Sequence, residues 1–219
     1  MGVLSKYKYG KKFMKLISAL RQAMLLMILP SFEWRVIRDT PMTTKMLFYN
    51  YALPVIIFSA IGKTIGSIFA IQSYWGFSWF MFLFPLYNFV SWIAMSYLVI
   101  FLSAIILNKL TPGFGAKNDL INTYKLVVYA YTPLLVATFF VYLHPVLRLL
   151  VPIGMYVFAV YTLYILWYGV HELYEIHLEK RVGFIFLVIL IELFFFFFLG
   201  KGFEITTNSL FPDMAIYLR

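Results

Sequence analysis

The sequence predicts an all-α protein, a polytopic membrane helical bundle with five transmembrane helices and an N-terminal amphipathic helix at the membrane interface. Five long apolar stretches alternate with short segments that bear charges. Each stretch is close to or above the ~20 residues that a helix needs to cross about 30 Å of hydrocarbon. With 63% hydrophobic and 12% charged residues, a chain of 219 residues would precipitate as a water-soluble globule. The predicted spans are residues 46–70, 77–107, 121–143, 149–168 and 182–199.

The placement of the basic residues predicts the orientation of the chain. Nine of the 18 lysines and arginines precede the first span, and cytoplasmic segments of membrane proteins are enriched in these residues. Residues 1–45 are therefore predicted to be a basic cytoplasmic segment. Residues 46–200 are predicted to form the five-span membrane domain, and residues 201–219 a short extracytoplasmic tail. The predicted location is the cell membrane, with the N-terminus in the cytoplasm and the C-terminus outside.

Residues 10–30 have the spacing of an amphipathic helix rather than of a span. Apolar residues recur every three or four positions opposite cations and polar residues, and Pro30 ends the run. Two placements are open: the helix rests on the inner leaflet, or it packs on the cytoplasmic ends of the spans as a lid. Because basic segments beside a membrane attract anionic lipid, membrane lipids are the predicted partners and nucleic acid is not. The predicted lipid-surface contacts are Lys11, Lys12, Lys15 and Arg21.

The first span is predicted to pack closely against another helix, and the second and third spans are predicted to contain irregular helix. Gly62 and Gly66 are four residues apart in the first span and form a smooth stripe that another helix can approach. Pro85 in the second span and Pro133 in the third are expected to kink or break their helices. Asn88 is near enough to Pro85 to bond a carbonyl that the proline leaves free.

Two ionisable residues lie well inside predicted spans, Glu192 about halfway along the fifth and Lys63 toward the outer end of the first. Charged groups inside a membrane are costly, so both are functional candidates, together with the polar Asn88. The favoured explanation is structural: a buried Lys63–Glu192 pair, or a neutral Glu192 bonded to a tyrosine or asparagine. The alternatives are a lysine that extends outward to the headgroups and a proton or ion relay. Near the inner surface, Lys125 can reach the headgroups in the same way.

The chain carries no motif of a soluble enzyme. It has no cysteine, glycine-rich phosphate loop, HExxH or GxSxG sequence, so no catalytic residue, metal site or cofactor is predicted. The densest polar cluster lies at the cytoplasmic end of the fourth span, where three members share one helical face. A divalent metal can bind such a face, but a solvated helix end with glutamates paired to nearby cations is favoured. The cluster consists of His171, Glu172, Glu175, His177 and Glu179.

The loop after the second span and the third span itself carry motifs that resemble a known family. The loop contains Thr-Pro-Gly-Phe-Gly at residues 111–115, and the span contains Tyr-Ala-Tyr-Thr-Pro at residues 129–133. This pattern is similar to the YIP family (Ypt-interacting proteins), five-span membrane proteins in which a Phe-Gly-Gly-like loop precedes a third span with Tyr-x-x-Pro. Ala116 stands where the family often has a second glycine. The family-motif residues here are Phe114, Gly115, Tyr131 and Pro133.

The resemblance implies an all-helical bundle with a cytoplasmic N-terminus and no enzyme activity, in a prokaryotic-type member without the long polar N-terminal domain of many eukaryotic members. Three functions are open. The favoured one is a non-enzymatic integral membrane protein that organises membrane lipid or a partner protein complex. The second is a small transporter, channel or lipid scramblase with a polar path near Lys63, Asn88 and Glu192. The third is an accessory subunit of a larger membrane assembly, in which a protein partner or self-association covers the fourth and fifth spans.

Overall fold

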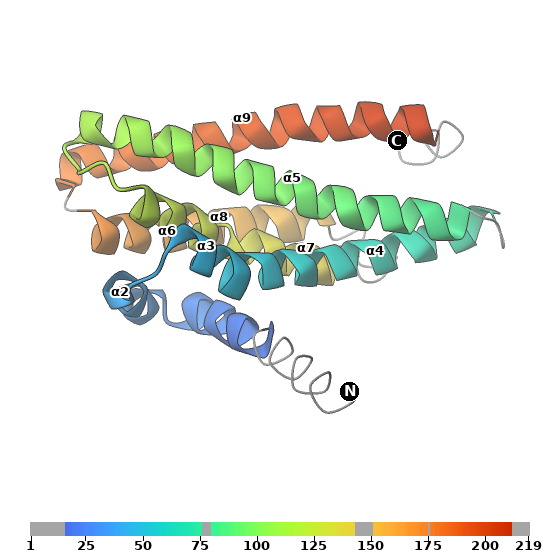
Figure 1. The fold of residues 1–219 in the computed structure, drawn as a ribbon, viewed down its shortest axis with the longest axis horizontal. Coiled ribbons are helices and arrows are strands. Elements are labelled where there is room, and N and C mark those ends of the chain that lie inside the picture. Colours follow the sequence, from blue (N-terminus) through green and yellow to red (C-terminus); the bar gives the residue numbers. More distant parts are fainter. Residues whose placement is uncertain (1–15, 76–79, 143–150, 175, 212–219) are drawn as a thin grey trace, which may run out of the picture.

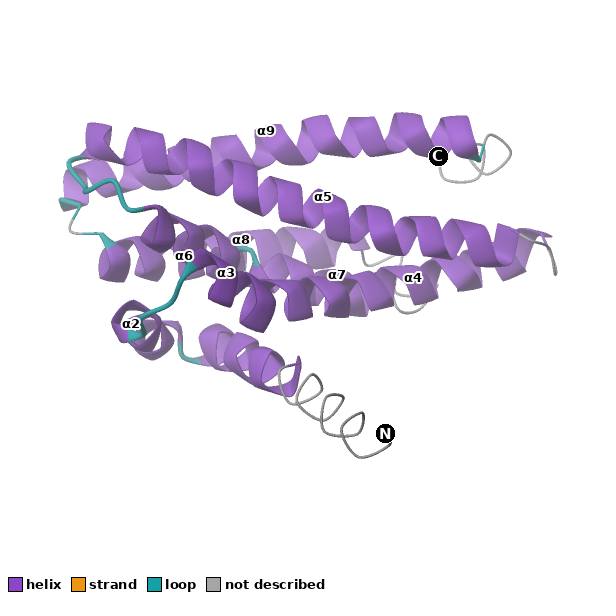
Figure 2. Cartoon of the chain, in the orientation of Figure 1, coloured by secondary structure: helices purple, strands orange, loops and turns teal. Residues whose placement is uncertain are grey.

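The computed structural model describes residues 16–75, 80–142, 151–174 and 176–211 (Figure 1). Every regular element within these ranges is a helix (Figure 2), which confirms the predicted all-α class. Inside lipid, long apolar segments fold as helices because a helix satisfies all of its backbone hydrogen bonds internally. The elements are the helix Leu16–Ile28, α2 (Pro30–Asp39), α3 (Thr44–Leu47), the π-helical turn η1 (Phe48–Ala52), α4 (Leu53–Trp75), α5 (Phe80–Leu110), the 3-10 turn η2 (Thr111–Phe114), α6 (Leu120–Ala130), α7 (Thr132–Tyr142), α8 (Val151–Leu173) and α9 (Leu178–Leu210).

Long helices run side by side along one axis, with α2, η2 and the start of α9 at one end of the bundle and the end of α9 at the other (Figure 1). Within the described residues, four helical segments are long and apolar enough to cross a membrane. The remaining predicted span, the fourth at residues 149–168, corresponds to α8, whose 23 residues measure about 35 Å. The membrane-bundle prediction is confirmed, and the count of five crossings stays a prediction. The four segments are Thr44–Phe69, Phe82–Phe114, Leu120–Tyr142 and Leu178–Leu210.

The long helices pack on one another in the order α8, α7, α4, α5 and α9. α4 lies against both α5 and α7, α8 packs on α7, and α9 packs on α5, while α8 and α9 touch each other little. The tightest core lies toward the end that holds α2 and η2, where Trp34, Leu126, Tyr129 and Phe184 are fully buried. This arrangement leaves space between α8 and α9 along the other half of the bundle.

The regular α-helix is interrupted at Pro133, one of the two expected places, and also before Pro54. The third span divides at Tyr131 into α6 and α7, because Pro133 has no N–H to donate to the carbonyl one turn earlier. Before Pro54, the chain forms η1, in which the N–H of Leu53 bonds the carbonyl of Phe48 five residues back. α5 continues through Pro85 without interruption.

The N-terminal helices fold against the bundle. α2 lies across one end of it, and the helix Leu16–Ile28 runs obliquely along its side (Figure 1). Ala19, Ala23 and Leu26 form the buried face of this helix. One face of the helix therefore packs on the bundle and the other is exposed, and both the cytoplasmic position and the contact with the inner leaflet stay predictions.

Candidate functional site

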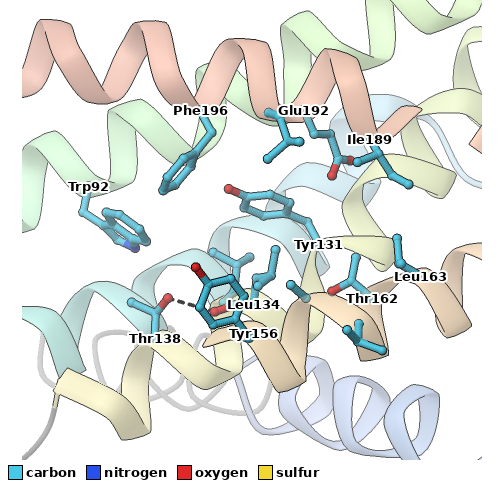
Figure 3. Close-up of a pocket in the computed structure, with 14 residues that line it drawn as sticks. Trp92, Tyr131, Leu134, Thr138, Tyr156, Thr162, Leu163, Ile189, Glu192 and Phe196 are labelled. Carbon is cyan, nitrogen blue, oxygen red and sulfur yellow. Dashed lines mark hydrogen bonds between the residues drawn. The ribbon is translucent and has the colours of Figure 1, made fainter. Parts of the chain in front are cut away.

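A cavity of about 570 Å³ lies between α5, α7, α8 and α9, in the space where α8 and α9 separate (Figure 3). Such a volume falls within the roughly 300–1,000 Å³ that is typical of small-molecule sites. Its walls are apolar apart from a few groups. The labelled lining residues are Trp92, Tyr131, Leu134, Thr138, Tyr156, Thr162, Leu163, Ile189, Glu192 and Phe196.

Glu192 is the one acidic residue among those that line the cavity. It lies near the middle of α9, about 21 Å along the helix from Leu178, and its side chain is half-buried. Its Oε1 atom is buried and has no hydrogen-bond partner among the described residues. Leaving a buried carboxyl oxygen without a donor is costly, so the cavity contains an unmet hydrogen-bond acceptor.

The two threonine hydroxyls of the cavity do not donate to this oxygen. Thr138 donates to the carbonyl of Leu134 at 2.8 Å (Figure 3), and Thr162 donates to the carbonyl of Phe158 at 2.9 Å. Threonine in a helix commonly bonds its own preceding turn in this way. The hydrogen donors of both threonines are thus used within their own helices.

Aromatic rings surround the space near Glu192. Trp92 from α5, Tyr131 from the break between α6 and α7, Tyr156 from α8 and Phe196 from α9 all line it (Figure 3). The indole N–H of Trp92 donates to the Ser59 hydroxyl at 2.7 Å, which fixes the orientation of the ring. Three helices and the break between α6 and α7 therefore each present a ring to the same cavity.

The cavity opens toward the outside of the bundle. Tyr156, Val160 and Leu193 on its rim are 75%, 67% and 60% exposed, respectively. Two of these three side chains are aliphatic, so the opening of the cavity is largely apolar.

Lys63 and Asn88, the other intramembrane candidates, do not line this cavity. The Lys63 ammonium lies 4.0 Å from the centre of the Trp92 ring and 5.1 Å from that of Phe203, and no ion pair joins it to Glu192 in the described structure. Asn88 is buried and donates to the carbonyl of Phe84 at 3.0 Å. The structure therefore brings none of the three candidates into contact with another.

The two glycines of the predicted stripe lie where α4 meets α7. A Cβ atom on Gly62 would come within 2.5 Å of the Phe139 backbone, and one on Gly66 would overlap the carbonyl of Tyr142. These helices approach closely because neither glycine carries a side chain.

The family-motif residues occupy two separate places. Phe114 packs edge-on against Phe184 of α9, with ring centres 5.3 Å apart. Gly115 ends η2 in the left-handed region at φ 85°, a conformation that favours glycine. Tyr131 and Pro133 form the break in the third span, and Tyr131 alone of the four family-motif residues lines the cavity.

At the end of the bundle that holds α2, charged side chains attach α2 to the rest of the protein. Lys125 is buried and its ammonium donates to the carbonyls of Ile37, Arg38 and Thr40 at 2.7, 3.4 and 2.9 Å. A cation at the end of a helix satisfies its last carbonyls and interacts favourably with the helix dipole. Lys125 thus binds the end of α2, where the sequence had suggested a contact with headgroups.

Arg38 links α2 to Glu172 near the end of α8. Its Nη1 atom lies 2.7 Å from Glu172, and Arg35 lies 3.8 Å from the same carboxylate. The hydrogen bond that Arg38 also donates to Asp39 holds the pKa of that carboxyl below its usual value.

His177 and Glu179 of the polar cluster lie beyond α8, which ends at Leu173, so the predicted shared helical face does not form. Glu175 lies outside the described residues, and no group of three potential metal ligands occurs within them.

Of the predicted lipid contacts, Lys11, Lys12 and Lys15 lie outside the described residues, and Arg21 is exposed on the helix Leu16–Ile28. The same outer face carries Met24 and Ile28, which are 59% and 71% exposed. The face is therefore apolar with a cation along it, as in helices that lie at a membrane interface.

Sequence analysis identified Glu192 but not the residues around it. Tyr156 and Trp92 had no distinguishing signal, because aromatic residues occur throughout the apolar spans. Tyr131 was selected only through the family motif, which gave no indication that it borders a cavity. The roles of Trp34 and Lys125 were also missed, because both depend on contacts between distant parts of the chain.

Comparison with known proteins gives one match. The Yip1 domain family matches residues 24–200, which is most of the chain. No curated protein and no solved structure matches the chain. The matched region begins near the end of the helix Leu16–Ile28 and ends in α9, so it includes α2 and every residue that lines the cavity. The chain therefore belongs to the Yip1 domain family of multi-pass membrane proteins.

Proposed function

We propose that this protein is a non-enzymatic integral membrane protein that organises anionic lipid at the cytoplasmic leaflet. The observation that carries the proposal is the outer face of the N-terminal helices. The helix Leu16–Ile28 is held to the bundle by one face and presents Ile17, Arg21, Met24 and Ile28 on the other. The spacing of four, three and four residues places these side chains on a single stripe.

The stripe continues onto α2. Phe32 and Val36 are 61% and 40% exposed, and Arg35 beside them has an exposed side chain. Apolar side chains of this kind enter the boundary between headgroups and acyl chains, while long basic side chains reach anionic headgroups. Membership of the Yip1 domain family, which is non-catalytic, agrees with a role in binding rather than in reaction.

The experiment measures lipid selectivity with the full chain in bilayers. Spin-labelled phosphatidylglycerol and phosphatidylcholine report the preference of the protein for anionic lipid through electron paramagnetic resonance. Arg21→Gln is expected to reduce this preference about fivefold, because one cation near the surface contributes about 1 kcal/mol, and high salt is expected to reduce it further. The control is Lys201→Gln at the opposite end of the bundle. An unchanged preference in Arg21→Gln, or an equal loss in Lys201→Gln, contradicts the proposal.

The cavity supports a second candidate, a small transporter or lipid scramblase. A carboxyl group beside an opening to lipid is a feature of transport paths, although Lys63 and Asn88 do not extend it. Purified protein in liposomes would then move lipid or ions at a rate that Glu192→Gln changes. Absence of flux, or flux that this substitution leaves unaltered, removes the candidate.

A further inference from the structure

We propose that the cavity between α8 and α9 binds a lipophilic organic cation, held by the carboxylate of Glu192 and the aromatic rings of Trp92, Tyr131, Tyr156 and Phe196. This binding site goes beyond lipid organisation at the cytoplasmic leaflet, because it lies near the middle of α9 and uses none of the N-terminal residues.

Glu192 lacks a hydrogen-bond donor for one carboxyl oxygen in the described part of the chain. Its Oε1 atom has no hydrogen-bond partner among the described residues, and the two threonines of the cavity donate elsewhere. Neither does a described lysine or arginine form an ion pair with it. A buried carboxylate requires a cation or hydrogen-bond donors, so a ligand that carries positive charge supplies what the protein lacks at this point.

The aromatic lining of the cavity favours a cation. The faces of Trp, Tyr and Phe rings attract cations, and aromatic cages are the usual binding sites for organic ammonium groups. A ring of the cavity already makes this interaction, because the Lys63 ammonium lies 4.0 Å from the centre of the Trp92 ring. One carboxylate with several rings is therefore complementary to a positive charge spread over an apolar body.

The opening and the volume of the cavity limit which ligands can enter it. The exposed rim formed by Tyr156, Val160 and Leu193 opens to the lipid side of the bundle. A ligand must therefore dissolve in the membrane before it enters. A cavity of about 570 Å³ admits a molecule with several rings. A small inorganic cation does not meet these conditions, since the walls offer it almost no other polar ligands.

The test uses the full chain in lipid nanodiscs and two probes of similar shape. Tetraphenylphosphonium is a lipophilic cation, and triphenylphosphine oxide is a neutral analogue; protein-free nanodiscs give the lipid background. Equilibrium dialysis is expected to show saturable tetraphenylphosphonium binding that weakens about tenfold in Glu192→Gln, equivalent to about 1.4 kcal/mol. Binding of triphenylphosphine oxide is expected to stay weak in both proteins. Glu204→Gln, on the same helix but away from the cavity, is the matched control and keeps full affinity.

A second variant protects the test against misfolding. Tyr156 is 75% exposed on the rim, so Tyr156→Leu leaves the core intact, and it is expected to weaken binding of the cation while leaving that of the neutral probe unchanged. The proposal is overturned if wild type binds no more tetraphenylphosphonium than protein-free nanodiscs. It is also overturned if Glu192→Gln and Tyr156→Leu both retain wild-type affinity, or if they weaken both probes equally. None of these results affects the lipid-selectivity measurement, so the two proposals fail independently.

Discussion

At the scale of single residues, two ionisable side chains inside the bundle differ in their hydrogen bonding. Lys125 donates to three backbone carbonyls and is fully engaged, whereas the Oε1 atom of Glu192 has no described partner. A charge with complete hydrogen bonding stabilises the fold, and one without it weakens the fold unless something else binds there. This contrast separates a structural residue from a candidate binding residue.

Replacement of Lys125 tests the structural role. Lys125→Met removes the donor from the last carbonyls of α2 and is expected to lower the free energy of unfolding by about 2 kcal/mol. Hydrogen exchange of the amides in α2 is expected to accelerate at the same time. Lys117→Met, which changes an exposed lysine nearby, is the control. Equal behaviour of the two variants in sodium dodecyl sulfate titration and hydrogen exchange would exclude this role.

The loop after α5 offers a matched pair of glycines. Gly115 has φ 85°, whereas Gly113 has no positive φ and has open space around it. Gly115→Ala is expected to cost about 1–2 kcal/mol, because a Cβ atom is strained in the left-handed region. Gly113→Ala is expected to have little effect. Thermal unfolding in detergent compares the two, and a Gly113→Ala variant as unstable as Gly115→Ala would refute the conformational explanation.

The charged residues inside the spans could be predicted from the sequence, but their partners could not. Glu192 and Lys63 were evident because charges are rare in apolar spans. Whether they pair depends on the depth and rotation of two helices, which the chain alone does not reveal. The structure places Lys63 over the Trp92 ring instead.

At the scale of elements, the apolar runs predicted where the long helices lie, and proline predicted the break at Tyr131. The turn η1 was not anticipated, although Pro54 was a visible signal for an irregular turn before it. α2 was also missed as a transverse helix, because its buried residues, Trp34 and Ile37 among them, contact α8 and α6 across long separations in sequence. Local patterns predict helices well and predict contacts between distant helices poorly.

The close contact of α4 with α7 makes a prediction about packing. Gly62→Ala is expected to cost about 1–3 kcal/mol of stability, because the new methyl group meets the backbone of Phe139, which cannot move independently. Gly202→Ala is the control, since nothing lies near that position and alanine favours helix. Sodium dodecyl sulfate titration measures both, and full stability of Gly62→Ala would show that the two helices separate at no cost.

At the scale of the whole molecule, η2 and the end of α9 lie at opposite ends of the bundle (Figure 1). If α8 crosses the membrane like its neighbours, three helical passages separate the loop that contains Lys117 from Lys201. The distribution of basic residues then predicts that Lys117 faces the cytoplasm and Lys201 the outside.

Single cysteines test this topology against a clean background, because the sequence contains none. In intact cells, a membrane-impermeant maleimide is expected to label Lys201→Cys and to reach Lys117→Cys only after permeabilisation. Labelling of both in intact cells would contradict an odd number of passages between them. Labelling of Lys117→Cys alone would reverse the orientation.

The way in which α2 is attached has a consequence for biosynthesis. The Trp34 indole donates to the carbonyl of Ile165, and the end of α2 is capped by Lys125, so both anchors are translated long after α2 itself. The N-terminal helices therefore emerge from the ribosome before their docking positions exist. They can dock only after α6 and α8 have been synthesised, so the N-terminal part of the protein reaches its final position later than the middle of the chain.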